Sequence, residues 1–291
     1  MTIGIIGLGL LGGSTALAFK EFLPDVRVIG VDTSRNHAAQ ALALGVVDKI
    51  LPLRKAVAQS EIVILAVPVD VMQDMLPSVL DAIHENAVVI DLGSTKEHIC
   101  QVADTHARRG RFVAAHPIAG TERSGPGSAF KELLLGKQMI ICDKEHSDID
   151  ALEAAENLFR NKLQMRISYM AGAAHDRHIA YVSHLSHISS FALSNAVLAK
   201  EKDEQSIFEM AGSGFSSTVR LAKSNPSMWA PIFTQNARNV GQALSAYIDQ
   251  LQRFKIWLDE QDESRMYQWM EEANAIRDIL SGIQPNEDNQ K

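Results

Sequence analysis

The chain has 291 residues and a formal net charge of −7 at pH 7, and 46% of its residues are hydrophobic while 22% are charged. This composition is typical of a soluble globular protein with one large or two modest domains, and it excludes a disordered chain. The acidic balance argues against a nucleic-acid-binding protein, because such proteins usually carry a basic face.

The cysteines and the N-terminal segment indicate the compartment. The two cysteines, Cys100 and Cys142, form neither a C-x-x-C pair nor a zinc-ligand spacing. We therefore expect no disulfide framework and a reducing compartment. No basic segment precedes the apolar run that begins at Thr2, and the run Ile62–Val69 is far shorter than the roughly 20 residues of a membrane span. These features predict a cytoplasmic protein without a signal peptide or a membrane contact.

In the first half of the sequence, short β-rich runs alternate with helical stretches. The alternation predicts an α/β fold with a doubly wound parallel sheet, covered by helices on both faces. The predicted strands are Ile3–Ile6, Val26–Val31, Ile62–Val67, Ala87–Asp91, Arg111–Ala115 and Gln138–Cys142.

After about residue 170 the pattern becomes helical. We expect a boundary at the strand-like Gln164–Tyr169, which divides the chain into residues 1–168 and an all-helical part, residues 169–291. A polar tail follows at Ile283–Lys291. The predicted helices are Ala171–Leu198, Pro226–Tyr247 with Asn225 as its N-cap, and Phe254–Leu280 with a break near Asp259–Asp262.

A glycine motif, G-x-G-x-x-G, lies between the first strand and the first helix. It reads Gly7-Leu8-Gly9-Leu10-Leu11-Gly12. Gly7 permits the tight turn, Gly9 lets a pyrophosphate approach the backbone, and Gly12 lets the helix pack against the strand. The free N–H groups of the helix then face the phosphates. This context favours a Rossmann-type dinucleotide site over an ordinary glycine-rich turn.

The end of the second strand bears on the choice of cofactor. Asp32 lies 20 positions after Gly12 and is suited to bind the ribose hydroxyls of an adenosine. Its charge would repel a 2′-phosphate, which favours NAD over NADP. Arg35 could accommodate that phosphate, so NADP remains possible, although Arg35 also fits a solvated first helical turn. Val67 and Pro68 follow the strand that begins at Ile62 and are suited to lie beside a cofactor ring.

Two further strands deliver polar side chains to the same edge of the predicted sheet. His116 follows the strand Phe112–Ala115 and is a candidate for proton transfer, since an imidazole titrates near neutral pH. Ser94 follows a neighbouring strand and could hydrogen-bond His116 or a substrate. The alternatives are a structural histidine and a serine helix cap.

The helical part adds three more candidates. His184 and His187 are three residues apart and share a helix face, where they could line a polar pocket or be hydrogen-bonded core residues. No metal-ligand spacing is present, so no metal site is expected. Arg220 follows the flexible Gly212–Gly214 and could bind a substrate carboxylate, or form a surface ion pair.

The chain resembles the prephenate and arogenate dehydrogenases of tyrosine biosynthesis over roughly residues 1–280. The resemblance implies an NAD-dependent oxidative decarboxylation of a cyclohexadienol, and a homodimer formed by the helical domain. The segments that carry it are Gly7–Gly13, Asp91–Lys96, His116–Glu122 (HPIAGTE), Ser183–His187 (SHLSH) and Thr218–Trp229.

The resemblance also implies a role for each matching residue. His116 looks like the family's catalytic histidine, Ser94 like the serine that orients it, and Arg220 like the arginine that pairs with a substrate carboxylate. Many relatives have an acid three residues before this arginine, where this chain has Ser217. The other positions that match the substrate pocket are Thr121, Glu122, His184, His187 and Trp229.

Three other functions compete with NAD-dependent oxidation of prephenate. Arogenate differs from prephenate only at the side chain, which is an amino acid and not a keto acid. A β-hydroxyacid dehydrogenase would use a lysine on the long interdomain helix, and Gly172–Leu198 contains none. A nicotinamide-binding redox sensor would need the glycine motif and Asp32 but would have no use for His116 and Arg220.

Overall fold

The structure, a computed structural model, describes residues 1–203 and 206–283. The predicted polar tail lies outside these residues except for Ile283. By its internal contacts the chain divides into two compact units, Met1–Val240 and Gly241–Lys291. In the described part of the chain, no helix is both long and apolar enough to cross a membrane.

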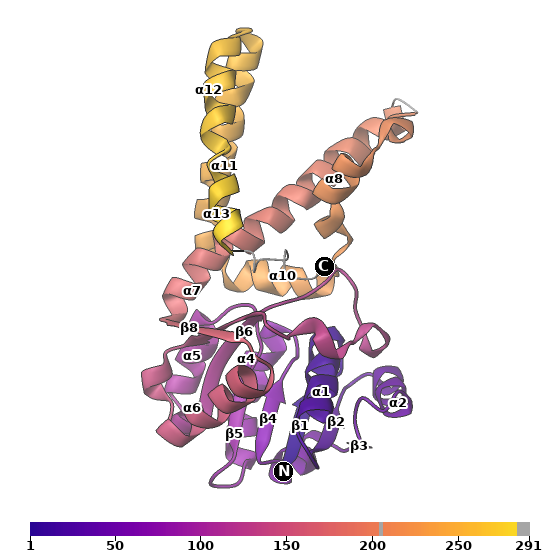
Figure 1. The fold of residues 1–291 in the computed structure, drawn as a ribbon, viewed down its shortest axis with the longest axis vertical. Helices are drawn as coiled ribbons and strands as arrows, with labels where there is room; N and C mark the ends of the chain where they lie inside the picture. The colour runs from indigo at the N-terminus through magenta and orange to yellow at the C-terminus, as the bar shows by residue number, and fades with distance from the viewer. Residues whose placement is uncertain (204–205, 284–291) are drawn as a thin grey trace, which may run out of the picture. The chain divides into compact units, whose positions relative to one another are not determined.

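An eight-stranded sheet forms the centre of the first unit (Figure 1). Its order is β3-β2-β1-β4-β5-β6-β7-β8, so the chain reverses its direction of travel across the sheet between β1 and β4. The strands are β1 (Thr2–Ile6), β2 (Arg27–Val31), β3 (Lys49–Ile50), β4 (Ile62–Leu65), β5 (Val88–Asp91), β6 (Phe112–Ile118), β7 (Gln138–Cys142) and β8 (Arg166–Met170).

The expected doubly wound parallel sheet is confirmed, with one exception: β7 pairs antiparallel with β6. No crossover helix connects these strands, since residues 119–137 contain only short helical turns, and a parallel connection usually needs such a helix. The antiparallel pairing also lengthens β6 to Ile118, beyond the predicted end at Ala115. His116 therefore lies within a strand opposite Ile140, and not in a turn.

Helices cover both faces of the sheet, as the alternating burial of the strand residues requires. Ile62 and Ile64 of β4 pack in one core cluster with Phe19 of α1. Val63 and Leu65 of the same strand pack in the other cluster with Leu76 of α4. The central strands are thus buried on both faces. This packing holds the ends of β1, β4, β5 and β6 in fixed positions.

The helices of the first unit include all those that flank the sheet and the first part of the helical region. The α-helices are α1 (Leu10–Phe22), α2 (Arg35–Ala43), α3 (Leu53–Ala58), α4 (Val69–Ala82), α5 (Glu97–Asp104), α6 (Ile149–Glu156), α7 (Gly172–Ile179), α8 (Leu185–Asp203), α9 (Ser213–Thr218) and α10 (Pro226–Gln235). Shorter or π-type turns are η1 (Arg109–Arg111), η2 (Pro126–Ser128), η3 (Lys131–Leu133), η4 (Lys144–His146), η5 (Asn157–Lys162), η6 (Ala180–His184), η7 (Phe208–Met210) and η8 (Arg220–Lys223).

Two predicted helices have different bounds in the structure. The helix expected over 171–198 contains the π-type turn η6 and runs on to Asp203. The helix expected over 226–247 breaks at Asn236, whose side-chain amide donates to the Asp176 carbonyl at 2.7 Å and approaches His184 Nδ1 at 3.2 Å. The break points the Asn236 side chain toward a buried hydrogen-bond network. Helical periodicity in the sequence does not predict such a break.

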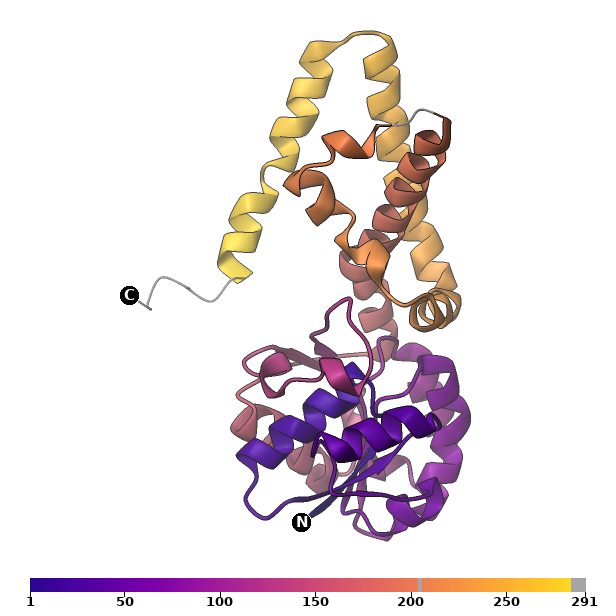
Figure 2. The same ribbon diagram turned by 90° about the vertical axis from the view of Figure 1, so that its right-hand side faces the viewer.

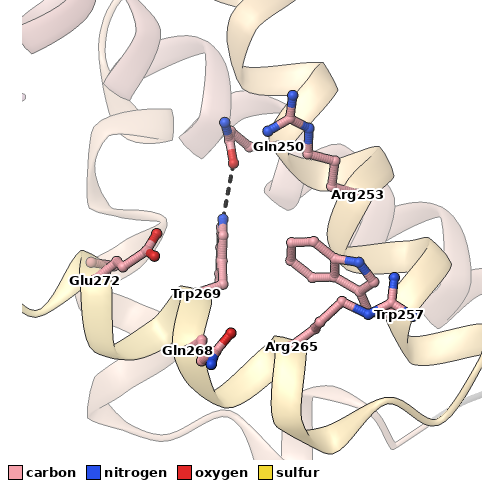
Figure 3. A pocket seen from close by; sticks show the side chains of 8 residues that line it. Gln250, Arg253, Trp257, Arg265, Gln268, Trp269 and Glu272 are labelled. Atoms are coloured by element: carbon pink, nitrogen blue, oxygen red, sulfur yellow. Dashed lines mark hydrogen bonds between the residues drawn. The ribbon is translucent and has the colours of Figure 1, made fainter.

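The second unit consists of α11 (Ala237–Asp259) from Gly241 onward, α12 (Glu263–Ala273) and α13 (Ile276–Ile283) (Figure 2). The predicted break near Asp259–Asp262 is confirmed, with Asp262 capping α12 through the Arg265 N–H. Trp269 of α12 packs against Phe254 of α11 and donates to Gln250, and the indole of Trp257 lies across a hollow from Trp269 (Figure 3).

Candidate active site

The glycine motif forms a cradle at the carboxyl end of β1. Gly7 has a φ of +95°, and a Cβ atom there would lie 2.4 Å from the Ala66 carbonyl oxygen. In contrast, a Cβ atom on Gly9 would meet no atom of the described residues within 4 Å. Gly9 is the N-cap of α1 and no side chain caps the helix. The loop therefore leaves open space against bare backbone N–H groups, which fits the diphosphate of a dinucleotide.

Asp32 stands beside this cradle, just after β2. One carboxylate oxygen accepts the Leu8 N–H at 2.8 Å and the other accepts the Ser34 N–H at 2.7 Å. Each oxygen keeps a lone pair for a further donor. The carboxylate is thus fixed against the glycine loop in a position suited to the two hydroxyls of a ribose.

The other cofactor candidates lie around the same loop. Leu8 is fully buried beneath it, and Leu10 and Leu11 form the partly buried first turn of α1. Val67 is half-buried against Gly7, and the exposed Pro68 is the N-cap of α4. Arg35 is exposed at the start of α2 and has no partner within the described residues. All of these residues gather at one edge of the sheet.

His116 lies on β6, and its side chain is 9% exposed. Its Nδ1 is 2.8 Å from Nε2 of His175 on α7, and the two rings meet edge to face. Burial, followed by the neighbouring His175, Lys96 and His184, holds the pKa of His116 well below its usual value. A neutral imidazole near the dinucleotide cradle is poised to accept a proton.

Ser94 is not the partner of His116, contrary to one of the two roles expected for it. It is half-buried after β5, and its hydroxyl has no hydrogen bond within residues 1–203 and 206–283. The partner of His116 is His175, which the sequence offers only as part of the adjacent His175-Asp176 pair near the start of the long predicted helix.

A buried polar network supports the histidine pair. The carboxylate of Asp176 accepts the N–H groups of Lys96 at 2.8 Å and Glu97 at 3.0 Å, which caps α5. The fully buried Lys96 side chain pairs with Asp91 and also donates to the Ala115 carbonyl at 2.9 Å. The residue immediately before His116 is thereby tied to the ends of β5 and α5.

His184, His187 and Trp229, which the resemblance implied line one pocket, come together in an aromatic cluster. His187 stacks on the Trp229 indole at 3.5 Å between ring centroids, and His184 meets it edge to face at 5.8 Å. Burial lowers the pKa of His184 to about 4 and lowers that of the half-buried His187. Among the described residues, His184 Nε2 and Trp229 Nε1 are buried without a hydrogen-bond partner, which marks them as groups available to a ligand or water.

Arg220 begins η8 and is 53% exposed. Its guanidinium lies 3.2 Å from the Glu122 carboxylate, in the loop after β6. Thr121, next to Glu122, accepts the Arg123 N–H with its hydroxyl at 3.2 Å. Ser217 bonds only the Gly214 carbonyl, so Glu122 is the acid that pairs with Arg220 in the described structure.

No three His, Cys, Asp or Glu side chains within residues 1–203 and 206–283 form a group that could hold a metal ion. Cys100 and Cys142 are both buried and unpaired. Burial raises the pKa of both thiols, which makes neither a reactive thiolate.

Two family models match the chain in succession. The nucleotide-binding domain of prephenate dehydrogenase matches residues 15–168, and the dimerization domain of prephenate dehydrogenase matches residues 171–272. Together they cover α1 from residue 15 onward, the histidine pair and the aromatic cluster.

Individual relatives agree with the family models. The chain is 30% identical to prephenate dehydrogenase of Bacillus subtilis, with 96% of this chain and 76% of the relative covered. It is 29% identical to cyclohexadienyl dehydrogenase of Zymomonas mobilis, with 94% of both chains covered. The structure is similar to that of Aquifex aeolicus prephenate dehydrogenase in complex with hydroxyphenyl propionate and NAD⁺, with a TM-score of 0.88, 28% identity, and 96% and 98% of the two chains covered.

Proposed function

The chain belongs to the prephenate dehydrogenase family, and from that premise we propose that it converts prephenate to 4-hydroxyphenylpyruvate with NAD⁺ as hydride acceptor. The observation that carries the proposal is the position of His116, a buried imidazole with a lowered pKa at the same sheet edge as the glycine cradle. A dehydrogenase that oxidises a hydroxyl group needs a neutral base at this place.

His116 would accept the proton of the ring hydroxyl at C4 while the hydride on C4 leaves with its electron pair. The bond between C1 and the ring carboxylate then breaks and releases CO₂, and its electrons make the ring aromatic. His116 returns the proton to the oxygen, which becomes the phenol of the product. Ser94, half-buried with a free hydroxyl in the described structure, is suited to contact the same oxygen.

The substrate carries two carboxylates, and the site offers matching donors. Arg220 would form a charge-assisted hydrogen bond to one of these carboxylates, which would replace its ion pair with Glu122. The orphaned His184 Nε2 and Trp229 Nε1 supply buried hydrogen-bonding positions, and the stacked His187 and Trp229 provide an apolar wall for a six-membered ring. We place Thr121 at the rim of this pocket.

NAD fits the cradle through features of this chain. Bound NAD⁺ would supply the hydride acceptor. Gly9, Leu10 and Leu11 would hold its diphosphate with backbone N–H groups, and Asp32 would hold the adenosine ribose. The fixed Asp32 carboxylate favours NAD over NADP, while the free, exposed Arg35 leaves room for some use of NADP. The relative from Aquifex aeolicus was crystallised with NAD⁺, which supports this choice.

A homodimer is part of the proposal. Large apolar side chains of the second unit are exposed along its helices, whereas α12 buries none of its residues. Helices that expose so many apolar side chains need a partner surface. The family's dimerization domain matches this region as far as residue 272. The exposed apolar residues are Ile248, Leu251, Ile256, Leu258, Tyr267, Met270, Ile276, Ile279 and Leu280.

The proposal also covers the division of the chain and its compartment. We assign cofactor binding to residues 1–168 and substrate binding and dimerization to residues 169–291, which agrees with the change of family model between residues 168 and 171. A cytoplasmic location fits the two buried, unpaired cysteines.

The test is NADH or NADPH formation followed at 340 nm, with prephenate and arogenate each crossed with NAD⁺ and NADP⁺. We expect the highest kcat/KM with prephenate and NAD⁺. Turnover with arogenate alone would keep the reaction and change the substrate. No turnover with any pair, from folded protein that binds NAD⁺, would contradict the proposal and favour a β-hydroxyacid dehydrogenase or a redox sensor.

The matched variant for this assay is His116→Asn. It should lower kcat by about 10²–10⁴-fold, the usual contribution of a general base, without changing the Kd for NAD⁺. A loss below about tenfold would remove His116 from the chemistry.

A further inference from the structure

Three buried side chains form a continuous hydrogen-bonded line behind the proposed base. His116 Nδ1 is 2.8 Å from His175 Nε2, and His175 Nδ1 is 2.7 Å from Asp176 Oδ1. His175 and Asp176 are each 2% exposed. Both contacts are direct hydrogen bonds, so the proton on each nitrogen is set by its neighbour in the line.

The line has a direction because one end can only accept. Both oxygens of the Asp176 carboxylate already accept a backbone N–H, from Lys96 and Glu97, and the carboxylate has no proton to give to His175. His175 Nδ1 must therefore carry the hydrogen that points at Asp176. A neutral His175 then has a bare Nε2, which can only accept from His116 Nδ1. In a neutral His116 the remaining nitrogen, Nε2, is bare as well.

The charges around His116 favour a neutral ring. His116 is faced by His175 from α7, by Lys96 at the start of α5 and by His184 from η6, and each of these opposes a positive charge on it. The Lys96 ammonium is fully buried, and its ion pair with Asp91 fixes its position near His116. Burial acts in the same direction.

We propose that His175 is a positioning residue that holds His116 as the Nδ1–H tautomer, and thereby makes His116 Nε2 the atom that takes the proton from the substrate hydroxyl. The substrate in this statement rests on the proposed function, whereas the tautomer does not. Without His175, the Nδ1 of His116 would lose its acceptor and the ring could rotate or carry its hydrogen on Nε2.

The position of His175 is fixed by its own helix and not by a ligand. The Asp143 carboxylate accepts the Gly172 N–H at 3.0 Å and caps the start of α7. A Cβ atom on Gly172 would lie 3.3 Å from the Lys96 carbonyl oxygen, so α7 and the start of α5 are closely packed. Asp176 of α7 caps α5 in turn. This cap fixes how α7 lies against α5, and it thereby places His175 within hydrogen-bonding distance of His116 on β6.

Two substitutions at His175 separate its two hydrogen bonds. In His175→Gln, the amide oxygen can take the place of Nε2 and accept from His116 Nδ1, although the contact to Asp176 is lost. In His175→Asn, the shorter amide can donate to Asp176 in place of Nδ1 but does not reach His116. Asp176 itself is a poor target, because its replacement would also remove the cap of α5.

The direct readout is the tautomer of His116, measured from ¹⁵N chemical shifts of the full-length, histidine-labelled protein without substrate, with His116→Asn assigning the signals. We expect Nδ1–H with a bare Nε2 in the wild-type protein and in His175→Gln, and loss of this single tautomer in His175→Asn. A wild-type His116 protonated on Nε2 would overturn the proposal, and so would identical spectra in the two variants.

Steady-state kinetics with prephenate and NAD⁺ give the second readout. His175→Asn should lower kcat by about tenfold or more with little change in KM or in the Kd for NAD⁺, and His175→Gln should recover most of kcat. Equal losses in the two variants would reduce His175 to a packing role. The expected tautomer in a protein that turns over neither prephenate nor arogenate would uphold the positioning role of His175 and contradict the proposed function instead.

Discussion

Gly12 crosses so close to Gly7 that a Cβ atom on Gly12 would lie 1.9 Å from the Gly7 carbonyl oxygen. The obstacle is backbone and cannot move aside as a flexible side chain could. This contact joins the first turn of α1 to the loop after β1, and it explains the third glycine of the motif as a requirement of packing. Gly9 differs, since its neighbourhood is open in the described structure.

This difference predicts opposite effects of two alanine substitutions. Gly9→Ala should fold with wild-type stability but weaken NAD⁺ binding, because its methyl group would enter the space that we assign to the diphosphate. Gly12→Ala should destabilise the protein by roughly 2 kcal/mol or more, since the loop and α1 must separate. Thermal unfolding and calorimetric titration with NAD⁺ measure the two effects. Unimpaired NAD⁺ binding by Gly9→Ala would place the cofactor elsewhere.

Asp32 predicts the cofactor preference. Asp32→Asn keeps an oxygen that can accept the Leu8 N–H but removes the charge that repels a 2′-phosphate. The ratio of kcat/KM for NAD⁺ to that for NADP⁺ should fall by about tenfold or more, because a close charge pair near a protein surface is worth a few kcal/mol. Arg35→Ala in the same background should restore part of the ratio. A ratio that Asp32→Asn leaves unchanged would remove this carboxylate from discrimination.

The ion pair between Arg220 and Glu122 predicts a change in KM. Arg220→Ala should raise the KM for prephenate by roughly 10- to 100-fold, the value of one charge-assisted hydrogen bond, while kcat changes less. Glu122→Gln is the matched control, since it removes the competing carboxylate and should not raise KM. If Arg220→Ala binds prephenate as well as the wild type does, another group must hold the carboxylate.

The buried His184 predicts that stability falls in acid. Its pKa is about 4 in the folded protein against 6.5 for an unperturbed histidine, so the unfolded chain binds a proton first as the pH falls. The stabilisation is complete above about pH 6.5 and is lost progressively toward pH 4, by a total of the order of 3 kcal/mol. His116 acts with the same sign.

Urea unfolding at about pH 7.5 and about pH 5, at one protein concentration, tests this dependence. The loss of unfolding free energy on acidification should be smaller in His184→Asn than in the wild type. An equal loss in both proteins would show that His184 is protonated in the folded state.

Much of the fold was predictable because it depends on local patterns. The strand before Gly7, the helix after Gly12 and Asp32 at the end of β2 follow from turn geometry and alternating hydrophobicity. The antiparallel β7 was not, since its run of buried apolar residues is the same in either direction. The direction of β7 follows from the connection before it. Residues 119–137 contain no crossover helix, and this is visible only in the structure.

Candidate site residues could be predicted where they belong to a sequence motif. Contacts between residues far apart in the sequence could not. His184, His187 and Trp229 come together as the resemblance implied. The contact of His116 with His175 joins a strand to a helix far along the chain, and it depends on how α7 packs on α5. Spacing within a sequence carries no information about such packing, and for this reason Ser94 was the partner that strand order suggested.

The proposed reaction couples oxidation to decarboxylation at His116, and it is tested by the rates at which NADH and CO₂ form from prephenate in one sample. We predict equal rates of formation of both products by the wild-type protein, and rates about 10²–10⁴-fold lower for both products with His116→Asn that still binds NAD⁺. NADH formed without CO₂, or equal turnover by His116→Asn, would contradict the account.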